Sequence, residues 1–196
     1  MPKTLRLFIS LNIQESIRNA LNDCISNIQK KGFDEIKWVE SQRIHLTLHF
    51  LGDVHKSLVY GINTQLNQIA NSLQPFIVTL SDIGVFPHIE NPRIVWVGIK
   101  QNSKTLNKLR NLTESKLSTL GIVTPEKPYK PHLTLGRVNR NCRISKKRLT
   151  ELMQQLKCGN LQMAWKIQEL HLIHSCPTSE GFEYHNIGVS RLGLKQ

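Results

Sequence analysis

The tetrapeptide HLTL occurs twice in the chain, at His45–Leu48 and again at His132–Leu135. Successive side chains of a β-strand point to opposite faces, so each copy places its histidine and its threonine together on one face. The leucines of each copy lie on the other face, where they anchor the strand in a core. Identity over four residues, two of them leucines, is weak evidence by itself. The repeated pairing of an imidazole with a hydroxyl makes His45 and His132 the candidate functional residues.

The segments around the two copies predict an alternation of strands and helices with helical or twofold spacing of apolar residues. Strands are expected at 4–11, 36–39, 44–51, 76–85, 93–99, 132–136, 165–173 and 182–189, with 175–181 as a loop. Helices are expected at 13–30, 54–73, 106–120 and 145–156, the first capped by Asn12 with Glu15. Because several strands follow one another directly, the pattern favours an α+β fold with antiparallel or mixed sheets and helices outside. The two copies have comparable positions in the two halves, which predicts two similar lobes facing one groove.

Composition is that of an ordinary globular protein and narrows the class of partner. The chain has 196 residues, of which 39% are hydrophobic and 20% charged, a size that suits one domain over 1–196. The 26 Lys and Arg against 14 Asp and Glu give a net charge of +12. This excess attracts polyanions such as nucleic acid, although a merely solubilising surface is an open alternative. No apolar run has the length of a membrane span, so no membrane partner is expected.

Cysteines and histidines do not show the spacing of a metal site. The four cysteines are scattered, which favours reduced thiols in a cytoplasmic protein over a zinc site or a disulfide scaffold. His49 follows His45 at helical metal-ligand spacing, but on a strand the two lie roughly 13 Å apart. We therefore expect His49 at the edge of the groove or exposed, and no metal or cofactor.

Two imidazoles at one groove suit the hydrolysis of a phosphodiester. One neutral imidazole can accept a proton from the attacking water, while the other, protonated, donates to the leaving oxygen. Histidine serves both roles because its ordinary pKa of about 6.5 keeps both forms available near neutral pH. Threonine hydroxyls and a cation such as Arg137 can bind the non-bridging phosphate oxygens.

The flanks of both copies resemble the two-histidine (2H) phosphoesterases, a superfamily with paired His-x-Thr/Ser-x motifs. The stretches RLFISLNI (6–13), KWVESQRIHLTLHFLGDV (37–54), DIGVFPHIENPRIVWVGI (82–99) and KPYKPHLTLGRV (127–138) carry the resemblance. They are similar to the bacterial and archaeal RNA 2′,3′-cyclic phosphodiesterases, historically named 2′-5′ RNA ligases. The similarity extends over nearly the whole chain.

The resemblance implies a bilobal fold with two antiparallel sheets around a central cleft. It also implies hydrolysis of a terminal RNA 2′,3′-cyclic phosphate to a 2′-phosphomonoester, without a metal and with a reverse ligase reaction. By carry-over, His45 is the proton donor and His132 the proton acceptor, and Thr47, Thr134 and Arg137 bind phosphate. A monomer acting on RNA ends is expected. The alternatives are a phosphodiesterase for a small nucleotide such as a 2′-5′ oligoadenylate, and a non-catalytic RNA-binding module.

The position of Arg137 conflicts with a regular strand. Arg137 lies five residues after His132, which puts the two side chains on opposite faces. A bulge or strand end at Gly136 would turn the guanidinium inward; otherwise Arg137 is structural. The first copy has Phe50 at the corresponding place, so the halves differ chemically.

Other candidate RNA contacts have equally good structural explanations. Arg140, Arg143 and the run Lys146–Arg148 form the densest basic cluster, which can hold an RNA backbone or be a solvated helix face. Phe8 and Tyr129 can stack on a base or pack in the core.

Overall fold

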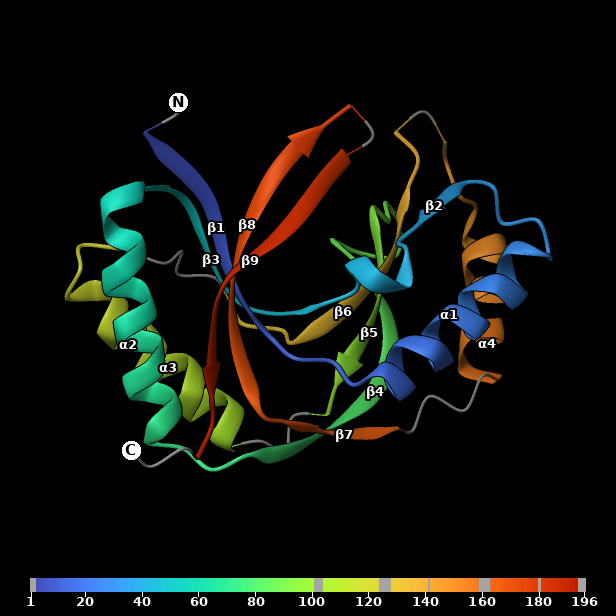
Figure 1. Cartoon of the computed structure of the whole chain (residues 1–196). Helices are drawn as coiled ribbons and strands as arrows, with labels where there is room; N and C mark the ends of the chain where they lie inside the picture. The colour runs from blue at the N-terminus through green and yellow to red at the C-terminus, as the bar shows by residue number, and fades with distance from the viewer. Residues whose placement is uncertain are drawn as a thin grey trace.

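The computed structural model describes residues 3–100, 104–123, 128–140, 142–158, 163–179 and 181–193, and it shows an α+β fold (Figure 1). In chain order the elements are β1 (Thr4–Leu11), α1 (Glu15–Gln29), β2 (Ile36–Trp38), the 3-10 turn η1 (Ser41–Arg43), β3 (Leu46–His55), the 3-10 turn η2 (Lys56–Leu58), α2 (Val59–Asn71), β4 (Phe76–Phe86), β5 (Ile94–Ile99), α3 (Lys104–Ser118), β6 (His132–Val138), α4 (Lys146–Cys158), β7 (Ala164–Ile167), β8 (Glu169–Thr178) and β9 (Gly181–Arg191).

The strands form one curled, antiparallel sheet built from two halves. Its order is β7-β4-β5-β6-β3-β1-β8-β9, with β2 paired to β6 at the side of this path. The halves meet where β3 pairs with β6, through Leu46 and Leu133. Both leucines are completely buried, and each contributes about 1.5–3 kcal/mol of burial to the joint. The two HLTL copies therefore lie side by side at the centre of the sheet.

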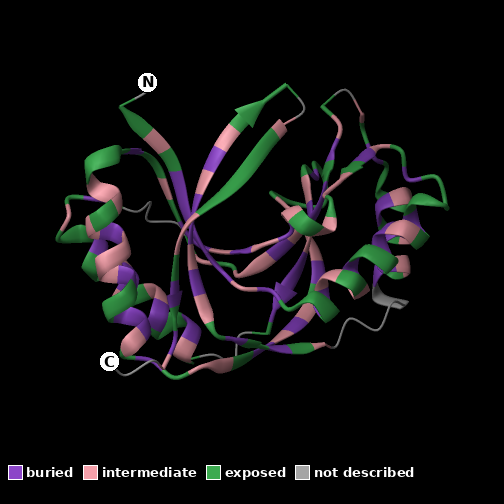
Figure 2. Cartoon of the chain, viewed as in Figure 1, coloured by how far each residue is buried: buried purple, intermediate pink, exposed green. Residues whose placement is uncertain are grey.

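The helices pack outside the curled sheet in two pairs. Helix α2 packs against α3, β8 and β9, whereas α4 packs against α1 and β4. The two pairs lie on opposite flanks of the molecule in Figure 1. Figure 2 shows that the buried residues concentrate along the strands and the inward helix faces. The expected α+β architecture with outer helices and a pseudo-twofold repeat is thus confirmed.

Both HLTL strands contain a β-bulge at the same place. On β3, Thr47 pairs with Ser10 and His49 with Ile9, which leaves Leu48 without a partner on β1. On β6, Thr134 pairs with Trp96 and Gly136 with Val95, which leaves the equivalent Leu135 without a partner on β5. Because a bulge adds one residue to a strand, it reverses the alternation of faces beyond that point.

The first helix begins differently from the prediction. Gln14, not Asn12, occupies the cap position of α1. The Asn12 carboxamide oxygen instead accepts hydrogen bonds from the backbone N–H groups of Gln168 (2.8 Å) and Glu169 (2.9 Å). Asn12 therefore fastens the end of β1 to the β7–β8 connection, a tertiary use that a local capping rule does not detect.

Two strand boundaries also differ from the prediction. Val54 and His55 belong to β3 rather than to the following helix, because β3 stays paired with β1 as far as Thr4. The expected strand 165–173 is two strands, β7 beside β4 and β8 beside β1. The expected loop 175–181 is largely strand: β8 runs to Thr178 and pairs with β9 over its whole length.

Within the described residues, each helix is too short or too polar to cross a membrane.

Candidate active site

The two candidate histidines occupy matching positions at the joint between the halves. His45 directly precedes β3, and His132 is the first residue of β6. Extending the Leu46–Leu133 register by one residue in each direction sets His45 opposite Thr134 and Thr47 opposite His132. Residues opposite each other in an antiparallel pair share a face, with Cβ atoms about 4.5–5.5 Å apart, and diagonal neighbours lie about 7–8 Å apart. The sheet thus brings both imidazoles and both hydroxyls to one face, with the imidazoles on a diagonal.

Backbone carbonyls fix the tautomer of both histidines. The Nδ1–H of His45 donates to the carbonyl oxygen of Arg43 (2.7 Å), and the Nδ1–H of His132 donates to that of Lys130 (2.6 Å). A carbonyl oxygen only accepts, so Nδ1 carries the proton in each neutral ring. Nε2 is then the atom that gains or loses a proton, and no described residue hydrogen-bonds to it. Each histidine bonds the residue two positions before it, so the halves match in this detail too.

Burial and positive charge lower the pKa of both imidazoles below the ordinary 6.5. Burial is the main cause of the lowered pKa of His45, and the charges of Arg18, His132 and Arg137 lower it further against the opposing hydrogen bond to Arg43. For His132, burial again lowers the pKa most, the hydrogen bond to Lys130 raises it, and the charge of Arg137 lowers it. The coupling of His45 to His132 and the shared influence of Arg137 place these three groups in one electrostatic neighbourhood. A bound phosphate anion would raise both pKa values, because it favours the imidazolium forms.

Aromatic rings flank each histidine on its own half of the sheet. His45 lies 4.8 Å from Phe8 and 5.1 Å from Tyr184, between ring centroids. His132 lies 4.9 Å from Phe86 and 6.1 Å from Trp96. These rings pack against the imidazoles and contribute to the burial that lowers their pKa values.

Three of these four neighbours were not singled out in the sequence. Phe86, Trp96 and Tyr184 come from β4, β5 and β9, far from either HLTL copy along the chain. Trp96 lies opposite Thr134 and therefore shares the face of His132. That relation depends on the strand order, which local periodicity does not determine.

The bulge at Leu135 resolves the position of Arg137. Arg137 pairs with Ile94, two residues from Trp96 on β5, so its side chain lies on the same face as Trp96 and Thr134. The expected irregularity next to Gly136 is confirmed, and the exposed guanidinium belongs to the histidine face. On β3 the matching bulge brings Phe50 to the equivalent place, 6.0 Å from Phe8 between ring centroids. One half therefore offers a cation where the other offers an exposed ring.

Arg18 supports the turn that leads into His45. Its guanidinium Nη1, on α1, donates to the carbonyl oxygens of Ser41 (2.7 Å), Gln42 (3.2 Å) and Ile44 (2.9 Å). These carbonyls surround Arg43, whose own carbonyl accepts from His45. Arg18 thus holds the backbone that sets the His45 tautomer, and its partial burial lowers its own pKa.

Two polar residues next to the site are structural. Tyr129 donates its hydroxyl to the carbonyl of Thr47 (3.1 Å), and burial raises its pKa above the usual range, so it is occupied by the core rather than free to stack on a base. His49 is only 4% exposed, and its Nε2–H donates to the carbonyl of Arg110 on α3 (3.0 Å). The expectation that His49 lies at the groove edge or exposed is therefore wrong: the Leu48 bulge turns it inward against α3.

The basic cluster after β6 is partly committed to packing. Arg148 lies over the ring of Phe33, with its Cζ 3.9 Å from the ring centroid. It also forms ion pairs with Glu35 (3.5 Å) and Glu151 (3.8 Å) and donates to the carbonyl of Gly32. Arg148 therefore joins α4 to the loop after α1 and is not a free phosphate ligand.

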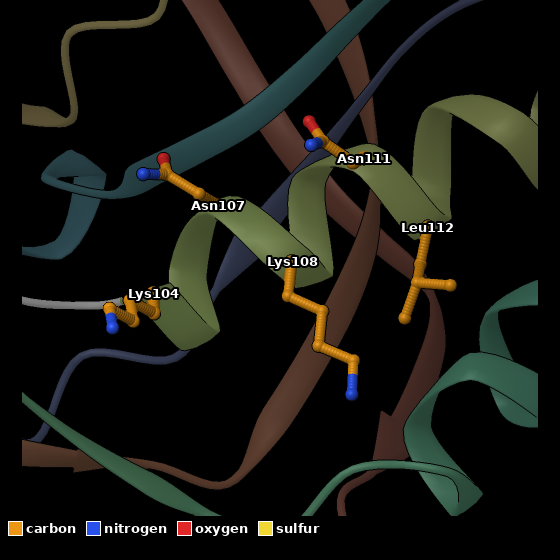
Figure 3. A pocket seen from close by; sticks show the side chains of 5 residues that line it. All are labelled: Lys104, Asn107, Lys108, Asn111 and Leu112. Atoms are coloured by element: carbon orange, nitrogen blue, oxygen red, sulfur yellow. The ribbon is translucent and has the colours of Figure 1, made fainter.

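A depression on the outside of α3 is separate from this face. Figure 3 shows the residues of one helix face that line it: Lys104, Asn107, Lys108, Asn111 and Leu112. It shares no residue with the histidine face.

Among the described residues, no group of three or more His, Cys, Asp or Glu side chains is arranged to hold a metal ion.

A curled antiparallel sheet with paired His-x-Thr strands at its centre defines the two-histidine phosphoesterase class. The family model of the 2′-5′ RNA ligase superfamily matches this sequence over residues 14–175. The chain belongs to this superfamily.

Relatives and solved structures agree with this membership. The RNA 2′,3′-cyclic phosphodiesterase of Methanothermobacter thermautotrophicus is 31% identical over 194 residues, covering 96% of this chain and 99% of the relative. The protein of the same name from Aquifex aeolicus is 30% identical, covering 97% of this chain and 99% of the relative. The crystal structure of TT0787 of Thermus thermophilus has a TM-score of 0.80 at 21% identity, covering 98% of this chain and all of that one. Escherichia coli LigT complexed with 3′-AMP has a TM-score of 0.74 at 23% identity, covering 97% and 99%. These structures support the fold.

Proposed function

We propose that the protein hydrolyses the 2′,3′-cyclic phosphate at an RNA end to a 2′-phosphomonoester, with His45 as proton donor and His132 as proton acceptor. The observation that carries this proposal is the pair of imidazoles on one face, each with Nδ1 held by a carbonyl and Nε2 available. Several relatives that are 30–35% identical have the name RNA 2′,3′-cyclic phosphodiesterase, which supports the substrate. The net charge of +12 suits a polyanion.

The reaction needs one proton on one histidine and none on the other. Neutral His132 takes a proton at Nε2 from water as the water oxygen bonds to phosphorus. The bond between phosphorus and the ribose O3′ breaks, and the Nε2–H of protonated His45 supplies a proton to O3′. The products are a 2′-phosphate and a 3′-hydroxyl, and solvent returns the histidines to their starting forms. The chemistry rests on the two imidazoles and calls on no metal ion.

We assign the binding of the phosphate to three further residues. Thr47 and Thr134 lie opposite His132 and His45, so their hydroxyls can donate to the non-bridging oxygens. Arg137 adds a cation on the same face, where it can stabilise the extra charge of the five-coordinate transition state. Their side chains carry no carboxylate that would repel the anion.

Product analysis tests the reaction. The purified protein is incubated with an oligoribonucleotide ending in a 2′,3′-cyclic phosphate, in excess chelator, and the position of the product phosphate is determined. We expect a 2′-phosphate at an unchanged rate with chelator. A 3′-phosphate would reverse the assignment of the leaving oxygen, and loss of activity in chelator would require a metal. Turnover of only small nucleotides, such as 2′-5′ oligoadenylates, would remove RNA ends from the proposal.

Replacement of each histidine separates an enzyme from an RNA-binding module. His45→Ala and His132→Ala should each reduce kcat by at least roughly 100-fold, because each removes a general acid or base. His174→Ala, on β8 away from both HLTL copies, is the matched control and should keep wild-type kcat. Near-wild-type turnover in either active-site variant would contradict the acid–base assignment.

We also propose that the enzyme is a single-domain monomer in the cytoplasm that can catalyse the reverse reaction. A site whose residues all come from one chain suits a monomer, and a sheet that is continuous across both halves suits one domain over 1–196. Free thiols at Cys24, Cys142 and Cys176 suit a reducing compartment such as the cytoplasm. The reverse reaction, with the two proton roles exchanged, would form a 2′-5′ linkage, and added RNA with a free 5′-hydroxyl tests for it.

A further inference from the structure

Three exposed aromatic side chains lie on the histidine face of the half that contains His45. Phe50, Phe182 and Tyr184 are 62%, 40% and 37% exposed. Phe50 is on β3, and the other two are on β9. We call these three residues the aromatic row. A single exposed ring is ordinary, but exposed apolar side chains that gather on one face often mark a binding site.

The strand register puts the aromatic row on one face. Phe8 pairs with Phe50 on β3 and with Ile173 on β8. Every second residue of β8 after Ile173 shares this face, namely Ser175 and Pro177. Ser175 pairs with Tyr184 and Pro177 with Phe182, so all three exposed rings lie on the face of Phe8 and His45.

Ring contacts connect the aromatic row to His45. Tyr184 lies 5.1 Å from His45 and 5.3 Å from Phe8 between ring centroids. Phe8 is almost fully buried at 3% exposure, so it forms the floor on which the exposed rings rest. Farther out, the Cζ of Arg6 lies 5.6 Å from the centroid of Phe182. Because this contact places the guanidinium beside the ring, we regard Arg6 as a support for Phe182.

Among the residues that the structure describes, the His132 half has no equivalent row of exposed rings. Phe86 and Trp96 are only partly exposed, and they pack against each other at 4.9 Å between ring centroids. The indole of Trp96 also lies directly over Gly84, where an added Cβ would be 2.3 Å from it. These rings are therefore packed within the protein, and Arg137 is an exposed cation on that side of the face.

We infer that the aromatic row stacks on the bases of single-stranded RNA at and before the reacting end, and this inference rests on the proposed function. Exposed aromatic rings stack on any base, because every base has a π-face. In the proposed reaction His45 protonates the ribose O3′, so the ribose and its attached strand lie on the His45 side, while the water enters from the His132 side. The aromatic row therefore lies on the side where the proposed roles place the RNA strand.

The experiment compares two substrates in two variants. A tetranucleotide and adenosine, each ending in a 2′,3′-cyclic phosphate, are assayed with Phe50→Ala and Phe182→Ala. Phe182→Ala should raise the KM of the tetranucleotide roughly 5-fold or more, as one lost stack implies, and leave its kcat and both constants of the mononucleotide unchanged. Phe50→Ala should likewise raise the KM of the tetranucleotide. Tyr60→Ala, an exposed ring on the outer helix α2 (83% exposed), is the control and should change nothing. Phe182→Trp should restore wild-type KM.

The outcome separates this inference from the proposed function. Fluorescence anisotropy measures binding of a labelled tetranucleotide with a plain 3′-hydroxyl, and of the same strand with abasic sites. If the rings stack on bases, wild type should bind the abasic strand more weakly than the normal strand, and Phe182→Ala should bind the abasic strand as well as wild type does. This result would support stacking even if the protein had no cyclic-phosphate turnover. Tetranucleotide KM values and affinities within twofold of wild type in both folded alanine variants would overturn the inference. Binding of neutral lipid vesicles that both variants lose would overturn it as well and assign the row to a membrane surface.

Discussion

Arg137 carries a positive charge that acts on both imidazoles and, in our proposal, on the substrate. The guanidinium disfavours a second positive charge nearby, so it lowers the pKa of His45 and His132. With burial acting in the same direction, both limbs of the pH profile of kcat/KM for the free enzyme should lie below the ordinary 6.5. The two apparent pKa values belong to the coupled pair rather than to either residue.

Arg137→Gln removes the positive charge beside both histidines. The substitution should raise the pKa values of His45 and His132 and move both limbs of the kcat/KM profile to higher pH. The rate at the optimum should also fall by about 10- to 100-fold, since hydrogen bonds to charged groups contribute roughly 1.5–3 kcal/mol. Steady-state kinetics from pH 4.5 to 8.5 measure both effects. Arg191→Gln, an exposed arginine on β9 paired with Glu169, is the control. A lower rate with unmoved limbs would mean that Arg137 binds phosphate without influencing the histidines.

At the scale of elements, the turn before β3 depends on a contact from another part of the chain. Arg18 on α1 holds three carbonyls of η1 and its flank, and this backbone sets the Nδ1 partner of His45. We therefore predict that Arg18→Ala reduces kcat by about 10- to 100-fold, since displacement of a catalytic group by about 1 Å has such an effect. KM should change less, because Arg18 does not face the phosphate.

A second substitution separates the two effects of Arg18. Arg18→Lys keeps the charge that lowers the pKa of His45, but its ammonium ends a shorter, flexible side chain and does not reproduce the rigid guanidinium that Arg18 extends to the three carbonyls. It should therefore lose most of the kcat while keeping the wild-type pH limbs, whereas Arg18→Ala should also raise the pKa of His45 and move the pH profile to higher pH. Wild-type kcat in a folded Arg18→Ala protein would show that η1 needs no such support.

The contact of β3 with α3 predicts a pH-dependent stability. Burial lowers the pKa of His49 below 6.5, and its hydrogen bond to Arg110 opposes this only in part. The unfolded chain then binds a proton that the folded chain does not, so the contribution to the free energy of unfolding is complete above pH 6.5. It is lost as the pH falls from 6.5 towards the lowered pKa. Denaturant unfolding of His49→Gln, which keeps an N–H donor, should show a flatter dependence between pH 6.5 and 5.

A leucine at the same position completes the test. His49→Leu leaves the Arg110 carbonyl without its donor and should lower the free energy of unfolding by about 1–3 kcal/mol at pH 7. If the wild type and His49→Gln show identical pH dependence, His49 takes up its proton in the folded state without cost.

Local patterns predicted most elements and the two HLTL strands, because alternation and leucine anchoring are properties of one strand. They failed where a segment serves a distant partner. The stretch 175–181 is expected as a loop, yet β8 continues through Pro177 to Thr178. β8 pairs with β1 only as far as His174, and beyond that point no described residue of β1 pairs with it. A proline lacks an N–H and is tolerated at such an edge.

The sequence likewise predicted the residues of the candidate site that lie on the two HLTL strands, but not those that reach it from other elements. His45 and His132 and their threonines followed from the repeat, and Arg137 needed only the bulge suspected at Gly136. Tyr184 could not be found, because its place beside His45 depends on β9 folding back along β8. Arg18 was missed for the same reason, since a helix residue that donates to a later turn leaves no periodic signal.

At the scale of the whole molecule, the net charge of +12 predicts how affinity depends on salt. Binding of single-stranded RNA releases counterions. The logarithm of the affinity therefore falls with the logarithm of the salt concentration, with a slope of about −0.7 for each neutralised phosphate. The kcat/KM for a tetranucleotide should therefore fall more steeply with added KCl than that for adenosine 2′,3′-cyclic phosphate. Kinetics between 50 and about 300 mM KCl test this expectation from counterion release. Equal slopes for the two substrates would confine the contacts to the reacting phosphate.

The strand order also determines when the protein can fold during synthesis. β1 is made long before β8, its neighbour on one side, because six strands and four helices lie between them in the described chain order. Until then one edge of β1 has no hydrogen-bonding partner, and such an edge is open to pairing with other chains. A nascent chain that stops before Glu169 already contains both histidines but lacks the strands that carry Tyr184 and complete the floor beneath His45. We therefore expect catalytic competence only after β8 and β9 have been made, and we expect fragments that stop before them to aggregate rather than act as partial enzymes.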